Sequence, residues 1–310
     1  MTTRFHWTVS QSACCVYAAA ALRRGRSIVD KELARAVAEP AKMLHSEIAA
    51  AGLPADRLWR HLLPLSATVE NNRQLVETAL KKLHGAGASI DLVAQRLGGR
   101  VADLEAAVQR DLPELVKDLS SSAAPLCEPL NAKAGPLLAA IGRLTDERLI
   151  VPDATVVVVP RTDPVGGTAN LLYNSVCIEL VSDDSAAELP ELPELPELLR
   201  LAWLVSQLNV DLPIFSENVH AERRPMIAAL SMLAVSLAAA EEAELSRCDL
   251  ATVKTALNAW QIEVRKANET AGVVLQWWET YLSSRPAWTV ALRALDEMIG
   301  EDLLPPADRG

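Results

Sequence analysis

The amino-acid sequence predicts a mainly α protein, with a helical-bundle-like architecture and a small two-stranded β ribbon in the middle of the chain. Apolar residues recur at spacings of three and four through most of the 310 residues, which is the period of an amphipathic helix. One β-branched run, residues 155–159, interrupts that pattern. Hydrophobic residues make up 50% of the chain, and a chain of this length buries a substantial core without disulfides or metal ions.

Residues 1–26 are expected to form an N-terminal extension outside the compact part of the protein. Their apolar run, residues 13–22, is compatible with a helix and ends in the loop-like sequence RRGR. A secretory signal carries its positive charges before the apolar stretch, whereas here they follow it. Ten residues are also too few to cross a membrane, so we expect no membrane association.

Residues 27–150 are expected to form a helical region. Ser27 or Asp30 is suited to cap its first helix. Pro40 is expected to break or kink that helix, and Gly52 is expected to end the stretch that follows. Further helices are expected at residues 70–84, 89–98, 101–111, 113–121 and 136–144.

Residues 151–304 are expected to combine the β ribbon with C-terminal helices and to pack against the first region. The ribbon, near residues 154–181, begins with the β-branched run and continues in a second strand within residues 171–181. The intervening DP and GG pairs are turn sequences, so a hairpin with a long loop is predicted. A two-stranded ribbon alone is marginal in water, and helices must therefore cover it.

A proline-rich segment, residues 188–198, separates the ribbon from the most hydrophobic helices. Its ELP repeats favour an extended spacer and forbid a regular helix before Glu197. We interpret it as a connector, with a recognition stretch as the alternative. Helices are then expected at residues 198–208, 226–244, 250–267, 271–282 and 288–299, before a tail at 305–310.

Five of the seven tryptophans lie in this C-terminal part of the sequence. Large aromatic side chains pack well in a core when the indole N–H finds a partner. We interpret them as core residues in preference to a ligand cage. They are Trp203, Trp260, Trp277, Trp278 and Trp288.

Charge and cysteine usage exclude several classes of protein. The net charge of -10 repels phosphate backbones, so nucleic-acid binding is not expected. Five cysteines, with one adjacent pair and no CxxC spacing, fit neither a disulfide framework nor a zinc knuckle. We expect reduced, mostly buried thiols and a cytoplasmic location.

No motif for catalysis or cofactor binding is complete. The phosphate-binding GxxxxGK[ST] loop, the dinucleotide-binding GxGxxG turn and the GxSxG nucleophile elbow are all missing from the sequence. His45 with Glu47, and His220 with Glu217 or Glu222, are neighbours that could contribute to a mixed metal site, and we interpret both as chance pairs. We therefore assign no catalytic, cofactor-binding or metal-binding residue and expect no cofactor.

One order of elements resembles a known family. A strand (TVVVVP), a glycine-containing turn with an edge strand (GGTANLLYNSVCIELV), a linker and a helix (LLRLAWLVSQLNVDLP) follow one another, as in zinc metallopeptidases of the gluzincin type. That resemblance implies an HExxH motif at residues 202–206, which here read AWLVS. Neither imidazole nor the general-base glutamate is present, so the resemblance implies a degenerate, inactive relative from which no site residue is carried over.

Residues 89–111 resemble a DNA-binding helix-turn-helix unit in their spacing. Ala94 would sit where two helices cross, and Gly98 would make the turn. The second helix, however, presents acidic residues where a reading helix needs base-edge donors. An ordinary helical hairpin is the preferred interpretation, and a positive face over Arg96, Arg100 and Arg110 would favour DNA binding.

These observations together favour a non-catalytic helical protein that binds another protein or associates with itself. A degenerate or atypical metallopeptidase-like enzyme is the first alternative, because of the order of elements. A helix-turn-helix DNA-binding protein is the second. The sequence contains no local signature that names a partner.

Overall fold

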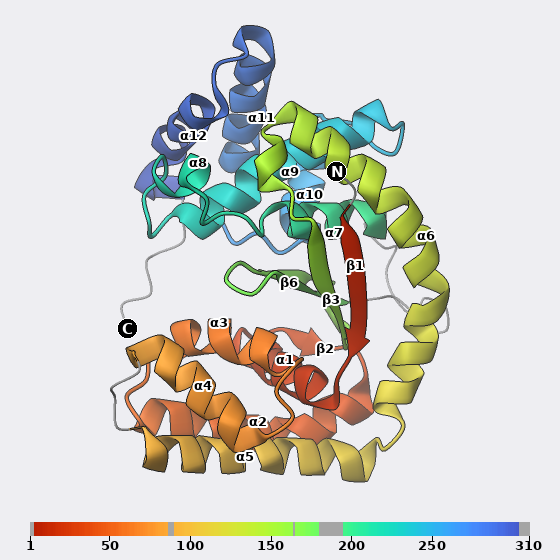
Figure 1. Cartoon of the computed structure of the whole chain (residues 1–310), viewed down its shortest axis with the longest axis vertical. Helices are drawn as coiled ribbons and strands as arrows, with labels where there is room; N and C mark the ends of the chain where they lie inside the picture. The colour runs from red at the N-terminus through yellow and green to blue at the C-terminus, as the bar shows by residue number, and fades with distance from the viewer. Residues whose placement is uncertain (1–2, 86–89, 164, 180–194, 304–310) are drawn as a thin grey trace.

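The computed structural model describes residues 3–85, 90–163, 165–179 and 195–303. The protein is mainly α, as the sequence predicts. It is 67% helical, and the described residues form 12 α-helices, a four-stranded sheet and a two-stranded sheet. Figure 1 shows the helices in two groups, one on each side of the four-stranded sheet.

The first five helices make up the N-terminal lobe, which lies at the bottom of Figure 1. Six helices make up the C-terminal lobe, at the top, and the long helix α6 (Leu115–Leu144) runs along the side of the molecule from one lobe to the other. A 3-10 turn, η1 (Glu147–Leu149), follows α6. The N-terminal lobe contains α1 (Gln11–Arg23), α2 (Lys31–Ala50), α3 (Ala55–Leu65), α4 (Asn72–His84) and α5 (Asp91–Asp111). The C-terminal lobe contains α7 (Glu197–Ser206), α8 (Pro213–Ser216), α9 (Arg224–Glu242), α10 (Leu250–Ala259), α11 (Ala267–Ser284) and α12 (Trp288–Leu303).

The four-stranded sheet has the order β1-β3-β6-β5. β3 pairs in parallel with β1 on one side and with β6 on the other, while β5 is antiparallel to β6. Helices α1 to α6 provide the long crossover that two parallel neighbours such as β1 and β3 require. The strands are β1 (Arg4–Val9), β3 (Asp153–Val159), β5 (Gly167–Asn170) and β6 (Ser175–Glu179), and β2 (Ser27–Ile28) pairs with β4 (Thr162–Asp163) in the small sheet.

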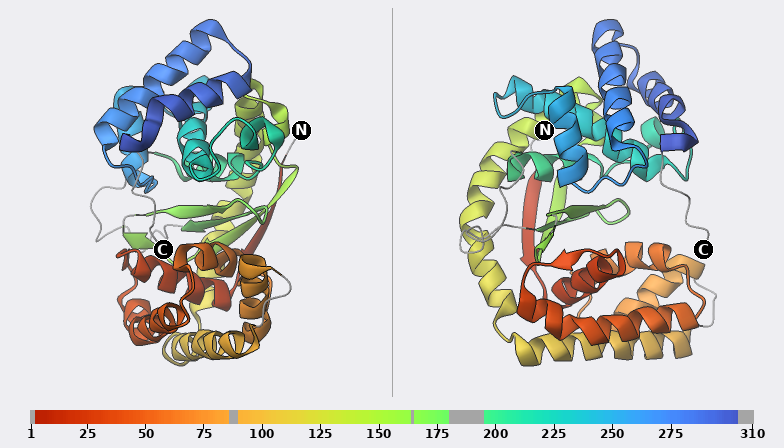
Figure 2. Two further views of the ribbon diagram at one scale, coloured as in Figure 1. Left: turned by 90° about the vertical axis from the view of Figure 1, so that its left-hand side faces the viewer. Right: turned by 180° about the vertical axis from the view of Figure 1, so that it is seen from behind.

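Each face of the sheet packs against a different lobe, so the fold has three layers (Figure 2). Val156 and Ile178 belong to the core of the C-terminal lobe. Their sequence neighbours on the same strands, Val157 and Cys177, belong to the core of the N-terminal lobe. A sheet covered on both faces needs apolar residues at successive positions, which explains the unbroken β-branched run of β3.

The first 26 residues differ from the expected extension, because β1 and α1 are integral to the fold. β1 pairs with β3, and its Trp7 Nε1 donates a hydrogen bond to Asn131 Oδ1 of α6 at 2.8 Å. The Ser10 side chain caps α1, and Cys14 and Cys15 are completely buried. A helix that is apolar on all sides is one that is buried on all sides, which accounts for the alanine-rich run.

The structure has a four-stranded sheet in place of the expected two-stranded ribbon, and the expected hairpin pairing of the two strands is wrong. The two strands read from the sequence are β3 and β6, which are neighbours but run parallel. The residues taken for turn sequence include β5, whose four residues pair with β6 in the actual hairpin. Glycine is a weak strand former, and the pairing of Gly167 with Ile178 is a tertiary contact that local propensity does not reveal.

Several expected helix boundaries also differ from the structure. α2 continues through Pro40, and α6 is one helix through Pro125, Pro129 and Pro136, because tertiary packing outweighs the local cost of proline. α5 is a single helix from Asp91 to Asp111, so the turn of the proposed helix-turn-helix unit is not formed. Two features are confirmed: Asp30 caps α2, and α7 begins at Glu197.

The five C-terminal tryptophans are buried, as expected, with 2–5% of each exposed. Among the described residues one helix, α9, is long and apolar enough to cross a membrane, and 72% of its apolar window is buried inside the protein. Most of the proline-rich segment and the tail at 305–310 lie outside the described residues.

Candidate functional site

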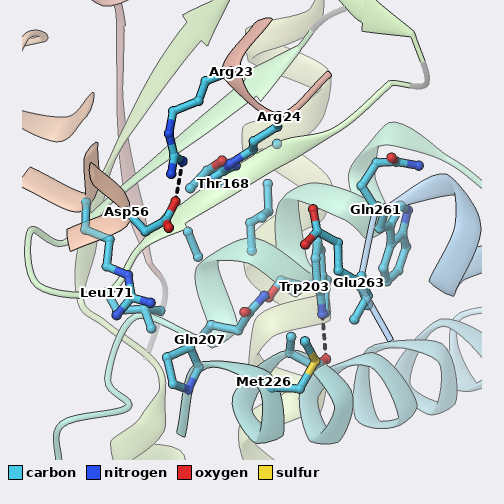
Figure 3. Close-up of a pocket in the computed structure, with 18 residues that line it drawn as sticks. Arg23, Arg24, Asp56, Thr168, Leu171, Trp203, Gln207, Met226, Gln261 and Glu263 are labelled. Atoms are coloured by element: carbon cyan, nitrogen blue, oxygen red, sulfur yellow. Dashed lines mark hydrogen bonds and ion pairs between the residues drawn. The ribbon is translucent and has the colours of Figure 1, made fainter. Parts of the chain in front are cut away.

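A cleft of about 630 Å³ opens between the two lobes at the β5 side of the sheet (Figure 3). It is the site we consider because it brings together side chains from both lobes and the end of the sheet. The N-terminal lobe contributes Arg23, Arg24, Asp56 and Arg60; β5 and the turn after it contribute Gly167, Thr168, Ala169 and Leu171; the C-terminal lobe contributes Trp203, Leu204, Gln207, Pro225, Met226, Ala229, Trp260, Gln261, Ile262 and Glu263.

The edge strand β5 is the central element of this cleft. It ends the sheet order, and within the described chain no strand pairs with its outer edge. An edge strand presents a row of main-chain N–H and C=O groups that no neighbouring strand satisfies. Gly167, Thr168 and Ala169 of β5 are half-buried and line the cleft, so this strand forms part of the cleft wall.

The wall of the cleft formed by the N-terminal lobe is basic. Arg23 Nη1, at the end of α1, forms an ion pair with Asp56 Oδ1 of α3. Arg24 and Arg60 are exposed, and neither has an ion-pair partner among the described residues. Arg23, Arg24 and Thr168 of β5 all line the cleft (Figure 3). This wall is a local positive surface on a protein whose net charge is -10.

The opposite wall, from the C-terminal lobe, is mainly apolar. The rings of Trp203 and Trp260 stack with centroids 4.9 Å apart. Trp203 Nε1 donates to the carbonyl of Ala229 at 2.9 Å, so its polar group is satisfied, and both rings are buried within the wall, with 4–5% of each exposed. Met226 lies on the same side (Figure 3). The charged group of this wall is Glu263, which is exposed.

A buried carboxylate, Glu179 at the end of β6, holds the frame of the cleft in place. None of its surface is exposed. Glu179 Oε1 accepts hydrogen bonds from Tyr17 Oη of α1 at 2.6 Å, from Thr162 Oγ1 of β4 at 2.8 Å, and from Arg26 Nη2 at 3.0 Å. Its Oε2 accepts from the main-chain N–H groups of Thr162 at 2.9 Å and Gly166 at 3.0 Å. This one side chain therefore connects α1, β4, β6 and the start of β5.

The same cluster reaches the C-terminal lobe through Arg200 of α7. Arg200 Nη2 donates to the main-chain carbonyl of Glu179 and forms an ion pair with Glu197. Gly166 is packed so closely that a Cβ there would lie 2.5 Å from Arg26 Nη2. Both walls and β5 are thus fixed to one buried polar cluster, which we call the Glu179 cluster (Tyr17, Arg26, Thr162, Gly166, Glu179, Glu197 and Arg200).

Burial dominates the electrostatics of this cluster. The pKa of Tyr17 lies well above its usual value because the hydroxyl is buried and also faces the negative charge of Glu179. Tyr17 therefore remains a neutral donor. Burial raises the pKa of Glu197, against the opposing effect of Arg200. Burial likewise lowers the pKa of the neighbouring Arg161.

Three of the residues weighed as metal ligands, His45, Glu47 and His220, have other partners. His45 Nε2 donates to the Ala19 carbonyl at 3.0 Å, and Glu47 forms an ion pair with Arg96. His220 has an exposed side chain 3.9 Å from Asp296. Glu217 and Glu222 are exposed. Within the described part of the chain, no group of three or more His, Cys, Asp or Glu side chains is arranged to hold a metal ion.

The helix that would carry HExxH in a gluzincin is α7, and it does line the cleft. Residues 202–206 contribute Trp203 and Leu204, and Gln207 follows one position later. An indole, an alkyl group and a carboxamide do not supply the imidazole and carboxylate ligands that catalytic zinc requires. This face of α7 is therefore unsuited to activate water.

The arginines that would have marked a DNA-binding face are each paired with an acid. Arg96 is paired with Glu47 of α2, and the other two have neighbours on α5. Gly98, expected at a turn, instead allows α4 to approach α5, because a Cβ there would lie 3.1 Å from the Arg73 Cα.

Sequence reasoning did not identify the residues of this cleft as a site. Glu179 is the one residue that the sequence could have marked as unusual, because it is a charged residue at the end of an apolar strand sequence. Arg24, Arg60 and Gly167 carry no such signal. Comparison of the chain with protein-family models, with curated proteins and with solved structures gives no match.

Proposed function

We propose that this protein binds an extended segment of another protein in the cleft between its lobes, without catalysing a reaction on it. The bound segment adds a strand to the outer edge of β5. The observation that carries the proposal is the position of β5, which ends the sheet and lines the cleft with three successive residues. Main-chain pairing supplies affinity in this mode of recognition, and the side chains around the groove supply specificity.

The dimensions and chemistry of the cleft support an extended peptide as the ligand. A volume of about 630 Å³ is within the range of small-molecule and peptide sites. Met226 is half-buried and provides thioether surface of the kind enriched where proteins bind one another, and the buried pair Trp203 and Trp260 makes this wall rigid. The Glu179 cluster fixes the start of β5, so the strand is held ready for pairing and little ordering entropy is lost on binding.

The resemblance in order of elements to gluzincin metallopeptidases is compatible with this proposal. A relative that lost its zinc ligands from α7 and kept its edge strand would retain peptide binding alone.

Self-association through a common face is favoured by no comparable observation. Large exposed apolar side chains are distributed over several elements: Met43, Leu92, Leu172, Leu245, Leu250, Leu282, Val290 and Met298. The cytoplasmic location stays a prediction from the cysteine pattern.

Peptide selection followed by main-chain methylation tests the proposal. Immobilised full-length protein is panned with a phage-displayed library of random heptapeptides, and enriched peptides are synthesised with a fluorescein label for anisotropy titration. N-methylation at alternate positions removes the N–H donors that face β5, whereas methylation at the intervening positions does not. With about 1 kcal/mol for each hydrogen bond, loss of two bonds weakens binding roughly thirtyfold in one methylation set only.

A cleft-filling variant locates the binding site. Ala229→Trp on α9 places an indole in the cleft and is expected to abolish binding, whereas Ala106→Trp, at an exposed position of α5, leaves it unchanged. Circular dichroism and the thermal midpoint establish that both variants fold. The proposal fails if no peptide is enriched, if both methylation sets weaken binding equally, or if folded Ala229→Trp binds like the wild type.

A further inference from the structure

The two walls of the cleft differ in chemistry. Because of the geometry of the sheet, this difference selects which side chains a bound strand can carry at alternate positions. Residues alternate between the two lobes along every strand of this sheet. On β5, Thr168 pairs with Cys177, which packs in the core of the N-terminal lobe. Ala169 pairs with Val176 and packs against the core of the C-terminal lobe. A strand added to β5 continues this alternation, because successive side chains point to opposite faces.

Every second side chain of an added strand would therefore face the basic wall. Arg24 and Arg60 are exposed there and have no ion-pair partner among the described residues, while Arg23 is paired with Asp56. Unpaired guanidinium groups at the edge of a groove favour carboxylates, to which they donate planar, bidentate hydrogen bonds. The positions of the bound strand on this side are suited to aspartate or glutamate.

The intervening side chains would face the wall of the C-terminal lobe. The half-buried side chains of Pro225, Met226 and Ala229 present apolar surface on this wall. The stacked rings of Trp203 and Trp260 are buried within it. The exposed carboxylate of Glu263 lies on this wall, and it repels an acidic side chain placed opposite. These positions are therefore suited to large apolar residues, and acidic residues are excluded from them by charge as well as by desolvation.

We propose that the ligand is an extended segment in which acidic and large apolar residues alternate. This inference rests on the proposed strand addition and specifies its partner. The pattern is the same when read in either direction, so it does not depend on whether the added strand runs parallel or antiparallel to β5. The local attraction acts against the net charge of -10, so selectivity for acidic segments depends on the arginines of this one wall.

Three synthetic fluorescein-labelled heptapeptides test the pattern against the full-length protein. The first, ELEIELE, alternates; the second, EELLIEE, has the same composition without alternation; the third, KLKIKLK, reverses the charge. We expect ELEIELE to bind at least about tenfold more tightly than either of the others, which corresponds to about 1.4 kcal/mol. Its affinity should also fall as salt is added, because exposed charges are screened.

Matched arginine variants assign the charge selectivity to the wall. Arg24→Gln and Arg60→Gln are each expected to weaken ELEIELE binding about two- to fivefold, the range for exposed ion pairs. Arg57→Gln is the control, because Arg57 is exposed on the same helix as Arg60 but does not line the cleft. Arg60→Glu should bind KLKIKLK more tightly than the wild type does, a gain that damage to the fold would not produce.

The outcomes separate this inference from the function on which it rests. It is overturned if ELEIELE and KLKIKLK bind equally, if EELLIEE binds as tightly as ELEIELE, or if Arg57→Gln has the same effect as Arg60→Gln. If a library peptide of another pattern binds and is weakened by only one of the two methylation sets, the alternation is wrong but strand addition stands. If no peptide binds, both proposals fail.

Discussion

Replacing Glu179 by glutamine should remove a large part of the stability of this protein. The substitution keeps the size and shape of the side chain but removes its charge. Arg26, whose side chain is 12% exposed, then loses a counter-charge 3.0 Å away. The amide also introduces an N–H donor among existing donors. If the amide nitrogen takes the position of Oε2, the main-chain N–H groups of Thr162 and Gly166 lose their acceptor.

The magnitude follows from the cost of breaking a buried charge pair. Removing one partner of such a pair destabilises a protein by about 3–5 kcal/mol, against a total stability of roughly 5–15 kcal/mol. With a urea m-value of about 3 kcal/mol/M, the midpoint of unfolding moves down by about 1–1.7 M. The measurement is equilibrium unfolding in urea, followed by both tryptophan fluorescence and circular dichroism.

Two comparisons make this result specific to the Glu179 cluster. Glu114→Gln removes an exposed partner of Lys117 and should change stability by roughly 0.5 kcal/mol or less. A double-mutant cycle between Glu179→Gln and Tyr17→Phe should give a coupling of about 0.5–3 kcal/mol, as for residues in one hydrogen-bonded network. A loss below about 1 kcal/mol for Glu179→Gln would refute the reasoning, because it is less than the penalty for one unsatisfied buried group.

Three further predictions concern packing, thiol reactivity and pH. Gly167→Ala places a Cβ 2.8 Å from Leu204 Cδ1 and should cost about 1–3 kcal/mol in urea unfolding; Gly99→Ala, with nothing within 4 Å, should be neutral or stabilising. Burial raises the pKa of Cys14 to about 12. In a thiol-reagent assay at alkaline pH, the Cys14 thiol of the folded protein should therefore stay unreacted while the half-buried Cys127 thiol reacts. Equal reaction rates for the two thiols would contradict the structure. Burial lowers the pKa of His45 below its usual 6.5; the unfolded chain then binds the proton first, so stability should fall as pH drops through about 6.5, and His45→Gln should reduce that slope in urea titrations at several pH values.

The sequence predicts the class of this fold because helix periodicity is a local property. Asp30 caps a helix through its own side chain, and the start of α7 follows from the proline at position 196. The burial of the C-terminal tryptophans follows from their size and apolar surface. Each of these inferences requires only neighbours within one or two helical turns.

The strand count and the role of the N-terminus were decided by contacts between distant segments. β1 forms a strand of the sheet because β3, almost 150 residues later, pairs with it. β5 contains a glycine and reads as turn sequence, yet β6 completes it as a strand. Proline residues 125, 129 and 136 remain inside α6 because that helix packs along the sheet and both lobes (Figure 1).

The candidate cleft is determined by tertiary structure alone. Its arginines come from α1 and α3, its edge strand from the middle of the chain, and its tryptophans from α7 and the end of α10. None of these residues has a spacing that marks it, because a groove between two lobes is lined by side chains that only folding brings together. The sequence by itself determined a helical protein without a complete catalytic motif. The structure decided that β5 ends the sheet within the described residues, because strand pairing depends on neighbours that are distant in the sequence.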